Sequence, residues 1–259
     1  MKVKELIQNN PDGLLNIFFT AGYPNLTSTV QVANHLAAAG IRMVEIGMPF
    51  SDPLADGKTI QDSSETALRN GMNIDIMFEQ VEEINANTDL VIILMGYYNQ
   101  LLTIGMVKFL EKCKTTGVDG LIIPDLPMEI YEQEYKDLFE EYEIAISFLI
   151  TPRTSLARIQ MADRLSSGFI YLVADNSITG AASGSFSTAQ IDYFERIKQN
   201  NLISPVLIGF GIKTSSQYKL TKKYANGAII GSEFIRKLST MATISQEPIS
   251  RFVNSITNC

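Results

Sequence analysis

Short apolar runs alternate with amphipathic segments along the whole chain. A continuous apolar run such as 90–95 is expected for a parallel strand that is covered on both faces. Between the runs, apolar residues recur at the spacing of a helix, as in 74–84. The pattern predicts helices alternating with strands at 14–20, 42–47, 90–95, 119–123, 144–150, 169–173, 205–208 and 226–230.

Eight such units in 259 residues correspond to the size of a TIM (β/α)8 barrel. The competing architecture is an open, doubly wound sheet. The barrel is favoured because no G-x-G-x-x-G follows the first strand, whereas glycine-rich turns follow the last two. No shift in composition marks a boundary. We therefore expect an α/β TIM barrel forming a single domain over 1–259, with an extra N-terminal helix and long loops after strands 2 and 6.

Composition narrows the classes of function. A net charge of −7 argues against nucleic acid or an anionic membrane surface as the main partner. His35 is the only histidine, so multi-histidine metal sites are excluded, no metal is expected, and a histidine-based triad is disfavoured. Cys113 and Cys259 form no disulfide framework. The first residues lack a continuous apolar stretch and no run reaches a membrane-spanning length, so we expect a cytoplasmic protein.

Two carboxylates are the main candidates for chemistry. Glu45 lies within an apolar strand, and Asp56 lies eleven residues later in a loop broken by prolines and Gly57. Burial raises the pKa of a carboxyl group and so suits Glu45 to proton transfer near neutrality. Asp56, on a loop over the same strand end, should be better solvated and stay ionised. The alternative is a structural Glu45 bonded to backbone or to an arginine.

A phosphate site is predicted at the ends of the last two strands. Gly209, Gly211, Gly231 and Ser232 fall where barrels of this kind bind phosphate through backbone amides. The alternative is that these glycines are ordinary turn residues. The long segment 174–188 resembles a lid whose tip is Thr179 and Gly180, although a plain surface loop would have the same composition.

Aromatic residues near the same strand ends suggest a pocket for a flat, apolar substrate. Phe18 ends the first strand, Tyr97 follows the third and Tyr171 ends the sixth. Core packing accounts equally well for any one of them. Asp125, after the fourth strand, is either a third pocket carboxylate or a helix N-cap.

These residues occur in motifs that resemble the tryptophan synthase alpha chain family. The most specific is EIGMPFSDPLADG at 45–57, and the resemblance covers essentially the whole chain. The supporting motifs, in the family's order, are FTAGYP at 19–24, YYN at 97–99, PDLP at 124–127, ITG at 178–180, GFGI at 209–212 and GS at 231–232.

The resemblance implies a carbon–carbon lyase of tryptophan biosynthesis. Its reaction is the retro-aldol cleavage of indole-3-glycerol phosphate to indole and glyceraldehyde 3-phosphate, with no cofactor in this chain. Glu45 matches the general acid/base, and Asp56 matches the carboxylate that stabilises positive charge on the indole nitrogen. The matches to the indole pocket are Phe18 and Tyr171, and those to the phosphate site are Gly180, Gly211 and Ser232.

The resemblance also implies a partner. An alpha chain passes indole through a tunnel to a beta chain, which carries pyridoxal phosphate, in an α2β2 heterotetramer. The loop around 51–53 and the loop after strand 6 would couple the active site of the alpha chain to that of the beta chain. Lys58, Asp175, Asn176 and Ser177 depart from the commonest family pattern.

The residues are also compatible with two other functions. A phosphate-binding barrel of this size could instead isomerise a sugar phosphate, although an aromatic pocket speaks against that reaction. The chain could also serve mainly as an allosteric activator of its beta partner, which the altered sixth loop suggests.

Overall fold

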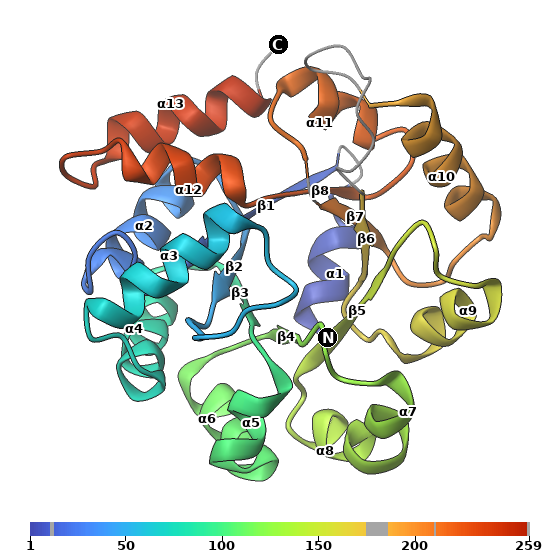
Figure 1. Ribbon diagram of the computed structural model, residues 1–259, viewed down its shortest axis with the longest axis horizontal. Coiled ribbons are helices and arrows are strands. Elements are labelled where there is room, and N and C mark those ends of the chain that lie inside the picture. Colours follow the sequence, from blue (N-terminus) through green and yellow to red (C-terminus); the bar gives the residue numbers. More distant parts are fainter. Residues whose placement is uncertain (11–12, 175–185, 210, 258–259) are drawn as a thin grey trace.

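Eight parallel strands close into a barrel in the order of the sequence (Figure 1). The computed structural model describes residues 1–10, 13–174, 186–209 and 211–257. The TIM-barrel prediction is therefore confirmed, and the open-sheet alternative is wrong because β1 pairs with β8. The strands are β1 (Leu14–Thr20), β2 (Met43–Gly47), β3 (Val91–Met95), β4 (Gly120–Ile122), β5 (Ala145–Ile150), β6 (Ile170–Val173), β7 (Val206–Gly209) and β8 (Gly227–Ile230).

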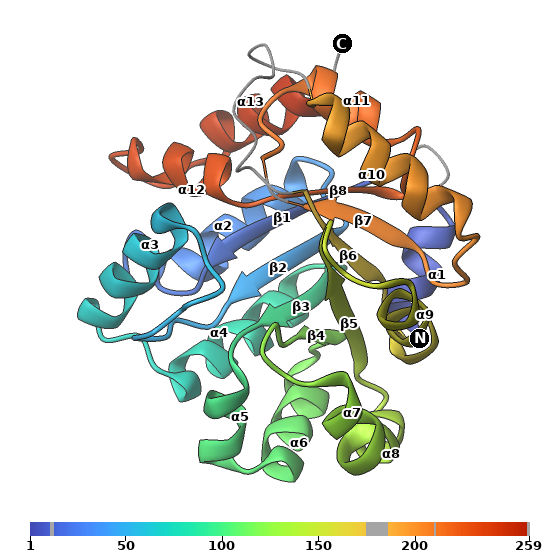
Figure 2. The same cartoon turned by 45° about the vertical axis from the view of Figure 1, so that its right-hand side comes forward.

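Helices surround the strands on the outside of the barrel, as the two views in Figures 1 and 2 show. The helices are α1 (Lys2–Gln8), α2 (Ser28–Ala38), α3 (Lys58–Arg69), α4 (Ile74–Asn87), α5 (Tyr98–Ile104), α6 (Met106–Thr116), α7 (Met128–Ile130), α8 (Lys136–Glu141), α9 (Leu156–Leu165), α10 (Thr188–Gln199), α11 (Ser215–Thr221), α12 (Ser232–Ser239) and α13 (Gln246–Thr257), with a π-helical turn at Tyr131–Tyr135 between α7 and α8. In the described part of the chain, no helix combines the length and the apolar character that crossing a membrane requires.

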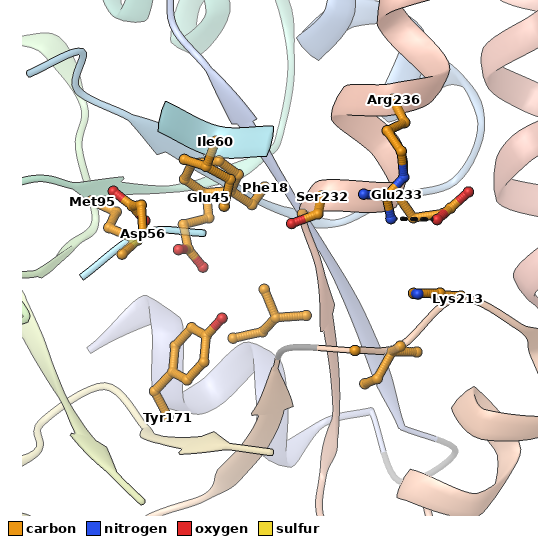
Figure 3. Close-up of a pocket in the computed structure, with 14 residues that line it drawn as sticks. Phe18, Glu45, Asp56, Ile60, Met95, Tyr171, Lys213, Ser232, Glu233 and Arg236 are labelled. Carbon is orange, nitrogen blue, oxygen red and sulfur yellow. Dashed lines mark hydrogen bonds and ion pairs between the residues drawn. The ribbon is translucent and has the colours of Figure 1, made fainter. Parts of the chain in front are cut away.

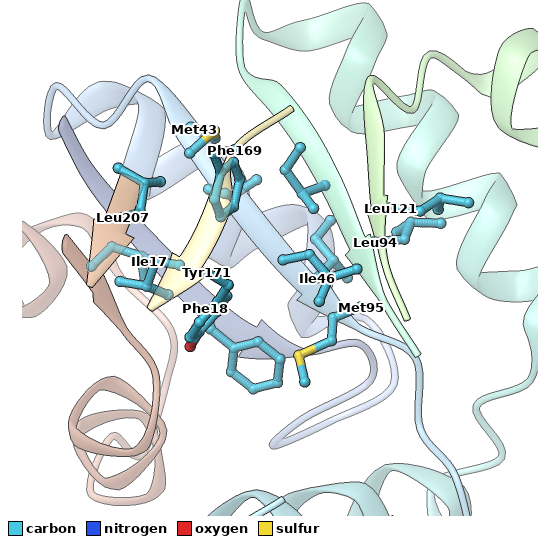
Figure 4. Close-up of a cluster of buried hydrophobic side chains, with 14 of the residues drawn as sticks. Ile17, Phe18, Met43, Ile46, Leu94, Met95, Leu121, Phe169, Tyr171 and Leu207 are labelled. Carbon is cyan, nitrogen blue, oxygen red and sulfur yellow. The ribbon is translucent and has the colours of Figure 1, made fainter. Parts of the chain in front are cut away.

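The register of the strands decides which side chains enter the barrel. Glu45 on β2 is level with Phe18 on β1 and with Ile93 on β3. Neighbours at one level of a parallel sheet point to the same face, so these three side chains share the interior. Val44 and Ile46 point outward and are buried beneath the helices. Figure 4 shows Phe18 and Tyr171 reaching into the same apolar cluster from β1 and β6.

The extra N-terminal helix lies at the end of the barrel where the strands begin. Lys2 of α1 forms an ion pair of 3.2 Å with Asp119, the residue before β4. Val3 and Ile7 on the same helix are buried. Because α1 occupies this end, the opposite end, where the strands finish, is left for a functional site.

Candidate active site

Glu45 lies inside the barrel and is almost completely shielded from solvent, with 1% of its surface exposed. Its carboxyl Oε2 accepts a hydrogen bond of 3.2 Å from Nδ2 of Asn16 on β1. In Figure 3 its carboxyl group and the hydroxyl of Tyr171 point into the same space. The alternative of a structural Glu45 held by an arginine does not apply, because Asn16 is its only hydrogen-bonding or ion-pairing partner within the described residues.

Asp56 is held over the barrel mouth by the loop between β2 and α3. The hydroxyl of Tyr97 donates to Asp56 Oδ2 at 2.8 Å and accepts from the amide of Ala55 at 3.0 Å. The ring of Phe50 stacks on Tyr97, with centroids 5.2 Å apart. The other carboxylate oxygen, Oδ1, is buried and has no hydrogen-bond partner among the residues that the structure describes. The loop therefore presents one unpaired acceptor to the pocket.

The two carboxyl groups differ in protonation state at neutral pH. Burial and, to a smaller extent, the charge of Asp56 raise the pKa of Glu45 to about 8. The hydrogen bond from Asn16 lowers this pKa and so offsets part of the rise. Burial raises the pKa of Asp56 to about 6, against a lowering by the Tyr97 hydrogen bond. Asp56 is half-buried rather than well solvated, so this part of the expectation was too simple. A group with a pKa of about 6 is still roughly nine-tenths ionised at pH 7, whereas Glu45 is mostly protonated.

The pocket has two sides, one with the two candidate carboxyl groups and the other at the start of α12 (Figure 3). Glu45 and Asp56 lie on one side, and Ser232 and Lys213 lie on the other. Ser232 is the first residue of α12, whose N-terminal backbone amides are suited to bind an anion. The lining residues are Phe18, Glu45, Asp56, Ile60, Met95, Tyr171, Gly211, Ile212, Lys213, Ile229, Gly231, Ser232, Glu233 and Arg236.

Two glycines make space for the aromatic walls of this pocket. A Cβ atom on Gly209 would lie 2.2 Å from the hydroxyl of Tyr171, and a Cβ atom on Gly47 would lie 2.6 Å from the ring of Phe18. Real Cβ contacts are never that short, so both positions require glycine for packing. Gly209 lies beside the pocket wall and is not among the residues that line the pocket.

Most of the predicted site residues meet in this one pocket. They are Phe18, Glu45, Asp56, Tyr171, Gly211, Gly231 and Ser232. Tyr97 acts through its hydrogen bond to Asp56 and does not line the pocket. Asp125 does not line the pocket and is not the N-cap of the helix that follows it, which is Pro127; its Oδ1 instead accepts a hydrogen bond of 2.8 Å from the first backbone N–H of α5, that of Tyr98.

Residues 175–185 of the predicted lid lie outside the described residues, whereas Thr188 at its end is the first residue of α10. Residues 175–185 include its tip, Thr179 and Gly180, and the departures at Asp175, Asn176 and Ser177. Lys58, the remaining departure, is exposed on α3 and pairs with Asp62 at 2.6 Å.

Sequence reasoning missed three polar residues of the site. Asn16 is the one amide within the first strand and is flanked by apolar residues, which was a usable signal. Lys213 directly follows the GFGI motif, but its type alone gave no reason to place it in a pocket. Arg236 lies one helical turn after Ser232, where it pairs with Glu233 at 2.7 Å and donates to Thr59 at 3.1 Å.

The closed barrel, with a buried acid and a second carboxylate at its C-terminal mouth, defines the class of the protein as a TIM-barrel enzyme. The family model for the tryptophan synthase alpha chain matches residues 4–258. The chain belongs to the tryptophan synthase alpha chain family.

Individual relatives agree with this assignment along nearly the whole chain. The tryptophan synthase alpha chain of Flavobacterium psychrophilum is 49% identical over 243 residues, which are 94% of each chain. That of Karelsulcia muelleri is 43% identical over 255 residues, or 98% of each chain. A solved tryptophan synthase complex from Pyrococcus furiosus contains a chain with a TM-score of 0.85 and 31% identity, covering 96% of this chain and 99% of that one.

Proposed function

We propose that the mouth of this barrel carries out the alpha reaction of tryptophan biosynthesis, cleaving indole-3-glycerol phosphate to indole and glyceraldehyde 3-phosphate. The chain is a carbon–carbon lyase by family. The observation that supports the site is a buried Glu45 in the same aromatic-walled pocket as Asp56, with the pKa of Glu45 raised further than that of Asp56. A retro-aldol reaction needs one group that gives and then takes a proton, and one group that stabilises the charge in between.

Glu45 would act first as an acid and then as a base. Its protonated carboxyl group gives the proton to the indole carbon that bears the glycerol side chain, which makes the ring cationic. The resulting carboxylate then takes the proton of the adjacent hydroxyl group, the carbon–carbon bond breaks, and its electron pair returns to the indole ring. The proton count on Glu45 is restored at the end of the cycle. A pKa near 8 suits both transfers, because neither protonation state is prohibitively costly.

Asp56 would stabilise the intermediate state. Its Oδ1 is an unpaired acceptor, and an indole ring has one N–H donor that becomes more acidic as the ring becomes cationic. An ionised acceptor held in place by Tyr97 stabilises this developing charge without having to reorganise. Phe18 and Tyr171 provide the walls between which a flat ring fits.

We infer that Lys213 contributes a positive charge to binding of the substrate phosphate. The protein as a whole is acidic, so its general field does not attract a phosphorylated substrate. Arg236 already forms an ion pair with Glu233, whereas Lys213 lines the pocket on the side of Gly211 and Ser232. The α12 N-terminus and Gly211 would supply amides, and Lys213 would supply the counter-charge.

Replacing Lys213 with Met should raise the KM for indole-3-glycerol phosphate about fivefold and leave kcat nearly unchanged. The side chain is exposed, so its contact with phosphate is worth only about 1 kcal/mol. The phosphate is distant from the reacting bond, so binding is weakened equally in the ground state and the transition state. Steady-state kinetics would measure this. Lys219→Met, on an exposed position of α11, is the matched control. An unchanged KM in Lys213→Met would contradict the assignment.

The direct test of function is release of indole from indole-3-glycerol phosphate by the purified chain, assayed alone and with a beta chain. Release in either arm supports the proposal. No release in both arms would overturn it. Release that needs the beta chain would show that the isolated alpha site depends on its partner.

The pH dependence of this reaction should show a basic limb near pH 8. Glu45 must start protonated, so kcat/KM should fall as the pH rises through the pKa of Glu45. The acid limb is less diagnostic, since Asp56 and the substrate phosphate both titrate at a pH of about 6. Rates measured from pH 6 to pH 10 would check this, and a rate that stays flat through pH 9 would exclude Glu45 as the acid.

The family implies a beta-chain partner. We propose an α2β2 assembly in which pyridoxal phosphate is bound only by the beta chain. Two exposed apolar side chains, on the segments that follow the C-terminal ends of β2 and β3, support a docking surface at that end of the barrel. Leu54, in the loop that carries Asp56, is 83% exposed, and Leu102 on α5 is 49% exposed. A partner that covers this loop would also bias the position of Asp56, which would couple the two sites.

A further inference from the structure

Asn16 is a buried polar residue with no structural task of its own. It lies in the middle of β1, level with Met43 on β2 and Ile229 on β8, and none of its surface is exposed. The only described hydrogen bond of its side chain is the one from Nδ2 to Glu45. Its Oδ1 is buried and has no partner among the described residues. An apolar side chain would fill this place without leaving an acceptor unpaired.

Other buried polar groups of the barrel are explained by the fold. The hydroxyls of Thr20 and Ser63 pair with each other at 2.6 Å and so connect β1 to α3. The hydroxyl of Ser147 accepts from the backbone N–H of Phe169 at 3.1 Å and so connects β5 to the start of β6. Asn16 makes no such connection within the described part of the chain, where the one partner of its side chain is the carboxyl group of Glu45.

We propose that Asn16 is a positioning residue that holds Glu45 in both of its protonation states. This rests on the proposed role of Glu45 as the acid/base. When Glu45 is ionised, the amide N–H of Asn16 donates to the carboxylate. When Glu45 is protonated, its O–H is a donor that the ionised form lacks, and Asn16 Oδ1 is an acceptor on the same amide. A single amide therefore provides the complementary group at each stage of the proton cycle.

The effect of Asn16 on the proton affinity of Glu45 has a definite sign. A hydrogen bond to a charged carboxylate is stronger than one to a neutral carboxyl group, so the net effect of Asn16 is to lower the pKa of Glu45, against the large raising effect of burial. The other titratable groups that line the pocket are Asp56, Tyr171, Lys213, Glu233 and Arg236. The charge of Asp56 raises the pKa of Glu45. Burial holds the pKa of Tyr171 well above its usual value, so the phenol stays neutral.

Asn16→Leu, which keeps the size of the side chain and removes both polar atoms, is the test. We expect the basic limb of kcat/KM to move up by about one pH unit, because a hydrogen bond to a charged group is lost. We expect kcat at pH 7 to fall roughly threefold, because a weaker acid protonates the ring more slowly. KM should change little. Thr221→Val is the control, because it removes a buried hydroxyl on α11 outside the pocket. Its basic limb of kcat/KM should lie at the same pH as in the wild type.

Asn16→Ser is the second variant, because a hydroxyl both donates and accepts and the smaller side chain fits the same space. Its limb should lie between those of the wild type and Asn16→Leu. A loss of activity in both variants with an unmoved basic limb would show that Asn16 is merely structural and would overturn the proposal. If the wild type itself releases no indole, the proposed function fails; if it does and the limb stays in place, only the role of Asn16 fails.

A measurement without substrate tests the role of Asn16 independently of the proposed function. A carboxyl group whose pKa is higher in the folded than in the unfolded protein makes stability fall as the pH rises through that interval. In Asn16→Leu this fall should extend to a higher pH than in the wild type, and thermal unfolding from pH 6 to pH 10 would show it. Coincident pH profiles for the two proteins would contradict the proposal.

Discussion

Replacing Glu45 with Gln is expected to reduce the rate of indole release by about 10³-fold. The amide has nearly the same shape and still accepts the hydrogen bond from Asn16, but it cannot give a proton to the indole carbon or take one from the hydroxyl. The measurement is kcat with indole-3-glycerol phosphate. Glu65→Gln, on the exposed face of α3, is the control and should retain the wild-type rate.

The same substitution should leave the protein folded and change how its stability depends on pH. The carboxyl of Glu45 titrates near 4.5 in the unfolded chain and near 8 in the folded protein, so wild-type stability falls as the pH rises through this window. The Gln variant does not titrate and should become more stable relative to the wild type as the pH rises. Near-normal turnover in Glu45→Gln would rule out Glu45 as the acid/base.

Replacing Asp56 with Asn is expected to lower kcat by about 10²- to 10³-fold, with a small change in KM. The amide oxygen still accepts from Tyr97, so the loop keeps its anchor, but the negative charge that faces the indole nitrogen is lost. Charge on the ring develops only in the transition state, so kcat carries the effect. Asp62→Asn, which removes an exposed carboxylate that pairs with Lys58, is the matched control.

Residual activity in Asp56→Asn gives a second readout. The charge of Asp56 raises the pKa of Glu45, so its removal should move the basic limb to lower pH. This shift is opposite in sign to the one expected for Asn16→Leu. If Asp56→Asn loses activity with no shift of the limb, the two carboxyl groups do not share an electrostatic environment, and the assignment of the pair is wrong.

Local sequence patterns were sufficient to predict the architecture and the two carboxyl groups proposed for the chemistry. The alternation of apolar runs with helical segments depends on burial within each element, which is read over a few residues, and it predicted the strands to within about two residues at either end. The pairing of Glu45 with Asp56 was also predictable, since both follow from one strand and the loop that leaves it. The position of Lys213 in the pocket and the close packing of Gly209 against Tyr171 could not be predicted, because each depends on neighbours from other strands.

By itself, the sequence determined that eight strands alternate with helices, that a carboxyl group lies within the second strand, and that glycines and a serine follow the last two. Only the tertiary structure decided what each of these groups touches. The amide of Asn16 contacts a carboxyl group 29 residues away, and Tyr97 contacts one 41 residues away. The physical reason is closure of the barrel: the register between neighbouring strands sets which side chains share a level of the interior, and burial there sets their proton affinities.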